Sequence, residues 1–294
     1  VEDDKDACSR WNTCILLPFR SKFRDDTGMC SIASMFSDLH PSLLLFLNRL
    51  NCIKFKNVVN DTLLVMRRKA LGDGIVRISH GNEIMSWLVV SKKLQGTLVR
   101  HDVHTTEIAL AFTLQETEKG EYEPYLKQQP VFAFLPLRNY GLKFILQGDF
   151  VLPSSREEVD ADNAWNQWLL SEFPSLFVSA QESFCSLPCF QSCPGKAVTA
   201  FMSFVPLAGE VHGFFCKLPH LILSKLRLNR CMVLEGSSSQ WVYPCNTLRG
   251  WDEQARKLLP DTILHEHLHL GYLSKDVTVS DTLSRALGIH EYGP

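Results

Sequence analysis

The spacing of apolar residues predicts short strands through most of the first half of the chain. Between residues 53 and 93, β-prone runs are separated by Asn57, by Gly72-Asp73-Gly74 and by His80-Gly81-Asn82, which are residues typical of turns. This alternation predicts an antiparallel meander. Further strands are expected over residues 13–19, 106–114, 131–137 and 142–152, with a polar loop over 116–129.

Two segments have the spacing of helices. Pro41 suits a first helical turn, and the leucines that follow it up to Leu50 recur at helical intervals, so a helix is expected from about Pro41 to Leu50. A second helix is expected to start at Ser154 or Ser155, because each serine lies three residues before a glutamate, as in a capping box. Helical spacing then continues to Pro174, where we expect this helix to end.

The pattern indicates a mixed α/β fold (α+β), with mixed and antiparallel sheets against packed helices. A length of 294 residues exceeds one comfortable core, and proline-punctuated shorter elements follow residue 184. We place domain boundaries to give segments 1–56, 57–190 and 191–294.

Composition narrows the class of protein. Apolar residues make up 45% and charged residues 21%, with a formal net charge of −2, so no large positive field favours nucleic acid as a partner. The longest apolar stretches fall well short of the roughly 20 residues of a membrane span. The ten cysteines are spread along the chain, which favours reduced thiols and an intracellular location.

One string has the residue types of a metal site. His265-Glu266-His267-Leu268-His269 matches the pattern in which two histidines one helical turn apart hold zinc and a glutamate acts as general base. Glu291 offers a third ligand and Asp261 a helix cap. Against this, Gly271 is expected to end the helix early, so zinc hydrolysis through His265, Glu266 and His269 stays a distant alternative and no metal is expected.

Cys185, Cys189 and Cys193 lie four residues apart, in a chain that also contains His212 and His220. Structural zinc sites pair two closely spaced cysteines with a second such pair, which the sequence lacks here. We therefore interpret these cysteines as buried structural thiols. The sequence also has no glycine-rich phosphate loop of the Walker type and no Gly-x-Ser-x-Gly elbow.

Several strings together resemble one family, the plant NO VEIN-type proteins, which are related to sacsin and carry an ATPase domain of the histidine-kinase, gyrase and heat-shock-chaperone type. The strings that carry the resemblance are Trp11 to Phe19, Asp38 to Pro41, Gly148 to Glu157, Asp162 to Gln167, Trp241-Val242 and Leu283 to Gly288. Residues 11–19 resemble the last strand of that ATPase fold, and Gly148 to Glu157 resembles the segment after it.

The resemblance implies a region that follows the ATP-binding core, like the middle domain of a chaperone. It implies no cofactor in this segment, with ATP and Mg²⁺ bound in a full-length protein, and it implies a nuclear location. The order Leu-Pro, Ser-Arg-Glu around Arg156 resembles heat-shock chaperones in which the matching arginine reaches the γ-phosphate, with Ser154 and Ser155 as helix caps beside it, although the spacing here is one residue shorter. Pairing of Arg156 with nearby carboxylates is the alternative.

Two functions remain open. The chain is either the non-catalytic middle segment of a chaperone-like ATPase, which couples the nucleotide state of a neighbouring ATPase domain to the binding of protein partners or clients, or a passive interaction scaffold whose lineage has lost ATPase function. Neither makes the segment an enzyme on its own.

Overall fold

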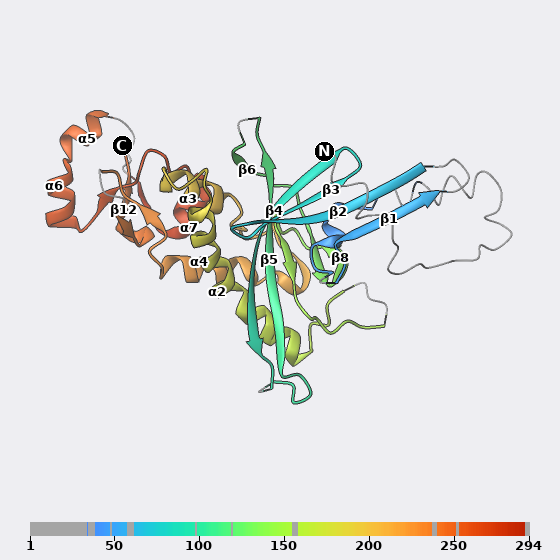
Figure 1. The fold of residues 1–294 in the computed structure, drawn as a ribbon. Helices are drawn as coiled ribbons and strands as arrows, with labels where there is room; N and C mark the ends of the chain where they lie inside the picture. The colour runs from blue at the N-terminus through green and yellow to red at the C-terminus, as the bar shows by residue number, and fades with distance from the viewer. Residues whose placement is uncertain are drawn as a thin grey trace. The chain divides into compact units, whose positions relative to one another are not determined.

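The computed structural model describes Ser34 and residues 39–47, 49–57, 62–97, 99–118, 120–154, 158–236, 240–250 and 253–291. The chain divides into two compact units, one made of residues 1–40 and 54–64 and the other of residues 41–53 and 65–294. The expected strand 13–19 lies outside the described residues. The second unit holds the helices and the cavity discussed below, and the described residues have the mixed α/β architecture that the sequence predicts (Figure 1).

A large mixed sheet forms one layer of this architecture. Its strand order is β1-β2-β3-β4-β5-β9-β7-β8, with β6 paired to β5. The strands are β1 (Cys52–Asn57), β2 (Thr62–Gly72), β3 (Ile75–His80), β4 (Glu83–Gln95), β5 (Thr105–Glu116), β6 (Tyr122–Pro124), β7 (Pro130–Ala133), β8 (Leu135–Asn139) and β9 (Ile145–Gln147).

The predicted meander is confirmed from β2 to β5, which pair antiparallel in sequence order. Its two tight turns have the backbone that their residues favour. Asp73 and Gly74 both have positive φ, at 50° and 76°, and Gly81 has a φ of 59°. Because left-handed backbone costs glycine little, these short turns let long strands fold back on each other.

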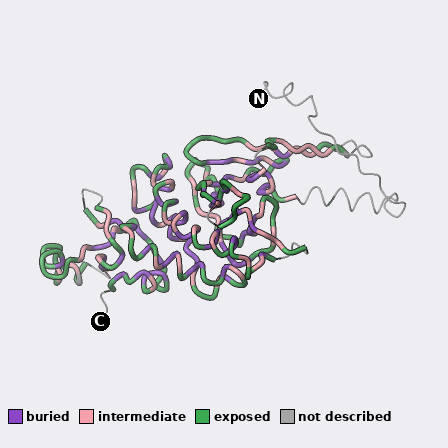
Figure 2. The backbone as a smooth tube through the Cα atoms, turned by 90° about the horizontal axis from the view of Figure 1, so that it is seen from below, coloured by how far each residue is buried: buried purple, intermediate pink, exposed green. Residues whose placement is uncertain are grey.

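Three helices supply the layer against one face of the sheet: α2 (Ala164–Ser186), α3 (Pro194–Ser203) and α4 (Leu218–Arg227). α2 packs on β4 and β5 and also contacts α3 and α4. The main core lies between these layers, where Leu110 and Phe112 of β5 belong to one buried cluster with Phe177 and Phe201. Figure 2 marks the buried stretches of the backbone in purple. Lys92, on the same face of β4, reaches Glu172 of α2 at 2.9 Å.

The opposite face of the sheet also buries apolar side chains. Trp87 of β4 and Ile78 of β3 are fully buried, and the 3₁₀ turn η2 (Pro41–Leu44) lies against β3. Phe46 packs edge-on against Phe132 of β7, with ring centroids 5.3 Å apart. Both faces of the sheet are therefore covered over part of their area.

The helix predicted from Pro41 to Leu50 is wrong beyond its first turn. Only Pro41–Leu44 is helical, as a 3₁₀ turn, and Leu44, Leu45 and Phe46 are buried in succession. A surface helix buries one stripe, so three consecutive buried residues need a tighter path.

The strand predicted over residues 131–137 is instead a hairpin of β7 and β8, which reverses at Phe134. The strand predicted over 142–152 is shorter, with only Ile145–Gln147 in the sheet. Part of the loop predicted over 116–129 forms the short strand β6. For the first two segments the local apolar pattern is right, but the chain turns beside the cavity described below.

The predicted start of the long helix is also wrong. α2 begins at Ala164, and its cap is Asn163, whose Oδ1 accepts hydrogen bonds from the backbone N of Trp165 at 3.0 Å and of Asn166 at 3.4 Å. Ser154 lies in a turn well before this point, and Ser155 and Arg156 lie outside the described residues. The helix cannot begin earlier because tertiary hydrogen bonds occupy the backbone of Val159 and Asp160.

Pro174 does not end α2, contrary to the prediction, because it lies inside the helix. Proline lacks the N–H that would bond to the carbonyl of Leu170. Pro174 is buried beside Phe173 and Phe177, and packing of this turn in the core offsets the lost bond.

Shorter elements complete the unit. They are η3 (Gly213–Phe215), β10 (Met232–Val233), β11 (Trp241–Val242), η4 (Pro244–Asn246), β12 (Thr247–Arg249), α5 (Glu253–Leu258), α6 (Asp261–Ile263), η5 (Leu264–Leu268), β13 (Gly271–Tyr272), α7 (Asp281–Leu287) and β14 (His290–Glu291). β12 is the parallel centre of a sheet ordered β13-β12-β14.

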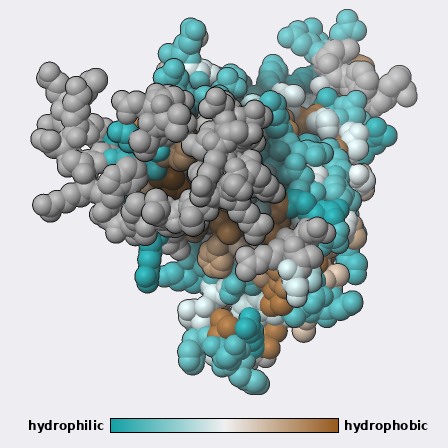
Figure 3. Space-filling model, turned by 90° about the vertical axis from the view of Figure 1, so that its right-hand side faces the viewer, coloured by the Kyte–Doolittle hydropathy of each residue, from teal (hydrophilic) through white to brown (hydrophobic). Residues whose placement is uncertain are grey.

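The main core is continuous across the position predicted as a boundary. Phe184, before residue 190, and Phe201 and Phe204, after it, belong to the same buried cluster. None of the described helices combines the length and the apolar character needed to cross a bilayer. Apolar side chains show between larger hydrophilic areas on the face drawn in Figure 3.

Candidate functional site

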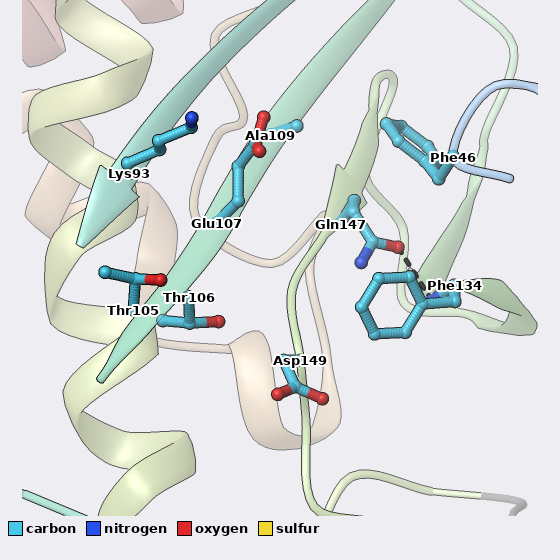
Figure 4. Close-up of a pocket in the computed structure, with 9 residues that line it drawn as sticks. All are labelled: Phe46, Lys93, Thr105, Thr106, Glu107, Ala109, Phe134, Gln147 and Asp149. Carbon is cyan, nitrogen blue, oxygen red and sulfur yellow. Dashed lines mark hydrogen bonds between the residues drawn. The ribbon is translucent and has the colours of Figure 1, made fainter. Parts of the chain in front are cut away.

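A half-open cavity of about 340 Å³ lies where β4 ends, β5 begins and the chain leaves β9. Its walls combine two phenylalanines with charged and polar groups (Figure 4). They are Phe46, Lys93, Thr105, Thr106, Glu107, Ala109, Phe134, Gln147 and Asp149. This volume lies near the lower end of the range for small-molecule or side-chain pockets.

Strand register brings the polar residues together. Lys93 of β4 lies directly opposite Glu107 of β5, and Ala109 of β5 lies directly opposite Gln147 of β9. Because side chains alternate along a strand, Glu107, Ala109 and Gln147 share the face turned away from α2. The cavity is therefore built on the sheet itself, which holds its floor rigidly.

Gln147 forms the polar centre of the cavity. It is only 4% exposed, and its Oε1 accepts a hydrogen bond from the backbone N of Phe134 at 2.9 Å. Its Nε2 points away from this bond into the cavity in Figure 4 and donates to no described residue. Because Nε2 opens onto the cavity, a ligand there can accept a hydrogen bond from it without displacing a bond within the described residues.

Phe134 is held in a backbone conformation that phenylalanine rarely adopts. Its φ is 61°, and its side chain is 47% exposed at the edge of the cavity. The neighbouring Leu135 is exposed to a similar extent. Left-handed backbone at a bulky residue costs about 1–3 kcal/mol, and such positions cluster at functional sites.

The two carboxylates of the cavity have no cationic partner within the described part of the chain. Neither Glu107 nor Asp149 forms an ion pair there, although Lys93 lies opposite Glu107. Asp149 is fixed through its backbone, because its carbonyl accepts a hydrogen bond from Nε1 of Trp165 at 2.8 Å. The lining thus offers two carboxylates, one ammonium group, hydroxyl groups and an amide donor.

The chain between Val151 and Asp160, described at residues 151–154 and 158–160, follows this cavity. Buried Asn166 of α2 holds both of its ends: its Nδ2 donates to the carbonyls of Val151 and Asp160, both at 2.8 Å, and its Oδ1 accepts from the N of Val151 at 2.9 Å. The backbone N of Val159 also donates to the hydroxyl of Tyr140 at 3.1 Å. The described ends of the loop are therefore firmly attached.

The predicted zinc motif does not form a single helix. α6 and the π-helical segment η5 end at His269, which has a left-handed φ of 54°. His265, Glu266 and His269 are all exposed, and Glu291 is paired with Arg249 instead. Throughout the described ranges, no group of three or more His, Cys, Asp or Glu side chains is placed to hold a metal ion.

The three closely spaced cysteines lie at the end of α2 and before α3. Cys185 and Cys189 are half-buried and pack against the main core, and burial, with a smaller effect of the Glu182 charge, raises the pKa of the Cys185 thiol to about 11. His212 and His220 are exposed. The Cys185 thiol therefore remains protonated at neutral pH.

The cavity was not found from the sequence alone. Asp149 falls inside a string quoted for the family resemblance, but Lys93, Glu107 and Gln147 come from three strands whose order only the fold reveals. The available signal was weak: three polar residues, Thr105, Thr106 and Glu107, begin the otherwise largely apolar strand β5. The candidate Arg156, by contrast, lies outside the described residues.

Comparison with known proteins finds similarity to one segment of a plant protein. No protein-family model matches the chain, and no solved structure matches it. The chain is 58% identical over 284 residues to Protein NO VEIN of Arabidopsis thaliana, a match that covers 97% of this chain and 10% of that protein. The chain thus spans about a tenth of the length of the curated relative that it matches. Over nearly its whole length, this chain is NO VEIN-like.

Proposed function

We propose that this chain is a non-catalytic segment of a longer, chaperone-like protein, and that it couples the nucleotide state of a neighbouring ATPase domain to the binding of a protein partner. The similarity to a relative about ten times as long supports a role as one segment among several. The neighbouring domain would be of the histidine-kinase, gyrase and heat-shock-chaperone type, and it would bind the ATP and Mg²⁺.

The cavity next to Phe134 carries the partner-binding half of this proposal. The buried Gln147 amide turns an unused donor toward solvent-accessible space, beside an exposed phenylalanine in a strained conformation. The left-handed backbone at Phe134 costs folding free energy in the free protein. A bound partner would gain by accepting the hydrogen bond and by covering the exposed ring.

The backbone held by Asn166 supports the proposed coupling between nucleotide state and partner binding. Asp149 lines the cavity, and Val151, only two residues further on, is the first loop residue held by Asn166. A displacement of the loop would therefore be transmitted along one short, well-anchored stretch of backbone to the cavity. Coupling requires that ligands at two sites shift the same structural element, and in this proposal that element is the segment 149–160.

Arg156 is our candidate for the contact with nucleotide. A guanidinium group suits the γ-phosphate because it offers several donors in one plane and stays charged. The arginine would not act from the N-terminus of α2, because that helix starts only at Ala164.

The test is ATP turnover by the longer protein with Arg156→Ala. We expect turnover to fall at least about tenfold, which corresponds to about 1.4 kcal/mol of transition-state stabilisation. The matched control is Arg49→Ala, since Arg49 is exposed and forms no hydrogen bond or ion pair within the described residues. Turnover unchanged by Arg156→Ala, or lost together with folding stability, would contradict the proposed role.

A further inference from the structure

We propose that the cavity between β5, β9 and Phe134 binds an arginine side chain within an extended segment of the partner protein. This inference rests on the proposed partner-binding function and names the chemistry of the partner. It follows from three groups in the cavity that have no counterpart in the free protein: the carboxylates of Glu107 and Asp149, the amide nitrogen of Gln147 and the ring of Phe134.

The two carboxylates of the cavity favour a cationic ligand. Glu107 and Asp149 come from different segments, β5 and the chain after β9, and both line the same cavity without an ion pair to a described residue. Lys93 of β4 lies directly opposite Glu107. Asp149 follows β9 and has no lysine or arginine opposite it in the strand register. A guanidinium has donors on two edges and can meet acceptors that lie apart, which an ammonium group does less well.

The Gln147 amide favours a ligand that also has a hydrogen-bond acceptor near the cation. Its Oε1 is fixed by the Phe134 N–H, which sets the orientation of the amide and leaves Nε2 as a donor facing the cavity (Figure 4). A lone cation would leave this donor unused. A peptide carbonyl next to an arginine supplies the acceptor, so a residue within a chain fits better than a free guanidinium compound.

The aromatic walls favour a planar cation. Phe46 is buried and Phe134 is half-exposed at the mouth, and both line the cavity. Guanidinium groups stack on aromatic faces, and desolvation at such a site strengthens the attraction. Exposed Leu135, next to Phe134, offers an apolar contact for a residue beside the arginine.

The experiment uses the ¹⁵N-labelled chain and a blocked pentapeptide that has arginine at its centre, leucine on either side of it and glycine at its ends. The Gln147 side-chain amide signal is followed by NMR as peptide is added. We expect a saturable shift of this signal. The same peptide with neutral citrulline in place of arginine is expected to bind at least about tenfold more weakly, because it keeps the shape and loses the charge.

Charge-neutral variants of the protein provide the second arm. Asp149→Asn and Glu107→Gln preserve size and are each expected to weaken peptide binding about fivefold or more, since each removes a charge-assisted hydrogen bond. Glu123→Gln on β6 is the matched control, because β6 pairs with β5 at Leu114–Glu116, away from the cavity, and it should leave binding unchanged.

Equal binding of the arginine and citrulline peptides, or no shift of the Gln147 signal at millimolar peptide, would overturn the proposal. A lysine peptide that binds as tightly would overturn the assignment to arginine. These measurements need no nucleotide, so their failure with a positive Arg156→Ala result would reject the cavity ligand alone. Peptide binding without any effect of Arg156→Ala would reject the nucleotide coupling alone.

Discussion

The Asn166 side chain hydrogen-bonds both backbone groups of Val151, accepting from its N at 2.9 Å and donating to its carbonyl at 2.8 Å. The same amide also donates to the carbonyl of Asp160 at 2.8 Å, so one buried residue of α2 joins the two ends of a loop. The Asn166 amide thus makes the two hydrogen bonds to Val151 that the backbone of a neighbouring strand would make. It fixes where the chain leaves the cavity and where it returns toward α2.

Replacing Asn166 should therefore destabilise the whole unit. Asn166→Ala removes three hydrogen bonds to half-buried backbone groups and leaves the Val151 N–H and the Asp160 carbonyl without these partners, so we expect the free energy of unfolding to fall by about 3 kcal/mol. The measurement is urea denaturation. The control is Gln167→Ala, which removes one exposed hydrogen bond to the carbonyl of Ala161 and should cost less than about 1 kcal/mol. Equal effects of the two substitutions would show that Asn166 does not hold the loop.

At Phe134, the left-handed backbone predicts an unusual order of stability, with the glycine variant above the valine variant. Valine normally suits a strand end better than glycine, but the φ of 61° is strained for a β-branched residue and easy for glycine. We expect Phe134→Gly to be more stable than Phe134→Val by about 1–2 kcal/mol in thermal or urea unfolding. A valine variant as stable as the glycine variant would mean that the turn does not keep its left-handed backbone.

Cys231 makes stability depend on pH in the alkaline range. Burial raises the pKa of its thiol from the ordinary value of 9.0 to about 12, and its Sγ donates a hydrogen bond to the carbonyl of Leu226 at 3.4 Å. Between these values the unfolded chain loses this proton and the folded chain keeps it. Stability contributed by the thiol is therefore complete below pH 9 and declines as the pH rises toward 12.

The check is to compare unfolding of the wild type and Cys231→Ala at pH 8 and pH 10. We expect the wild type to lose about 1 kcal/mol more than the variant over this interval, because each pH unit beyond the unfolded pKa changes the free energy by about 1.4 kcal/mol. Cys245→Ala, at an exposed cysteine, should behave as the wild type. An identical loss in wild type and Cys231→Ala would contradict the assignment.

The zinc alternative has a direct chemical test. His269 lies past the end of the helical segment that holds His265 and Glu266, so we expect the purified protein to contain less than stoichiometric zinc by elemental analysis. One zinc ion per chain, removed by the double substitution His265→Ala and His269→Ala, would instead support a metal site.

Local chemistry explains which parts of the fold could be predicted. Asp73, Gly74 and Gly81 dictate their turns through their own backbone preferences, so the meander followed from the sequence. The start of α2 did not, because the serines before it have good capping chemistry but Asn163 caps the helix and Asn166 draws the preceding backbone into a loop. Long-range contacts outweigh local propensity there.

The cavity depends on the same long-range order. Glu107 and Gln147 are brought to one face only because β9 pairs with β5, and Phe134 marks a wall only because its backbone reverses the chain within a single apolar run. A pattern of alternating residues predicts that strands exist but not which strands become neighbours. The strand partners therefore had to come from the structure.

We propose that a change of nucleotide in the neighbouring domain alters this segment through the backbone between Val151 and Asp160. The most direct measurement is amide hydrogen exchange over residues 151–160 in the longer protein, compared between a non-hydrolysable ATP analogue and ADP. We predict slower exchange with the ATP analogue, together with unchanged exchange in α4, which lies outside the proposed path. Identical exchange over residues 151–160 in the two nucleotide states would contradict the account.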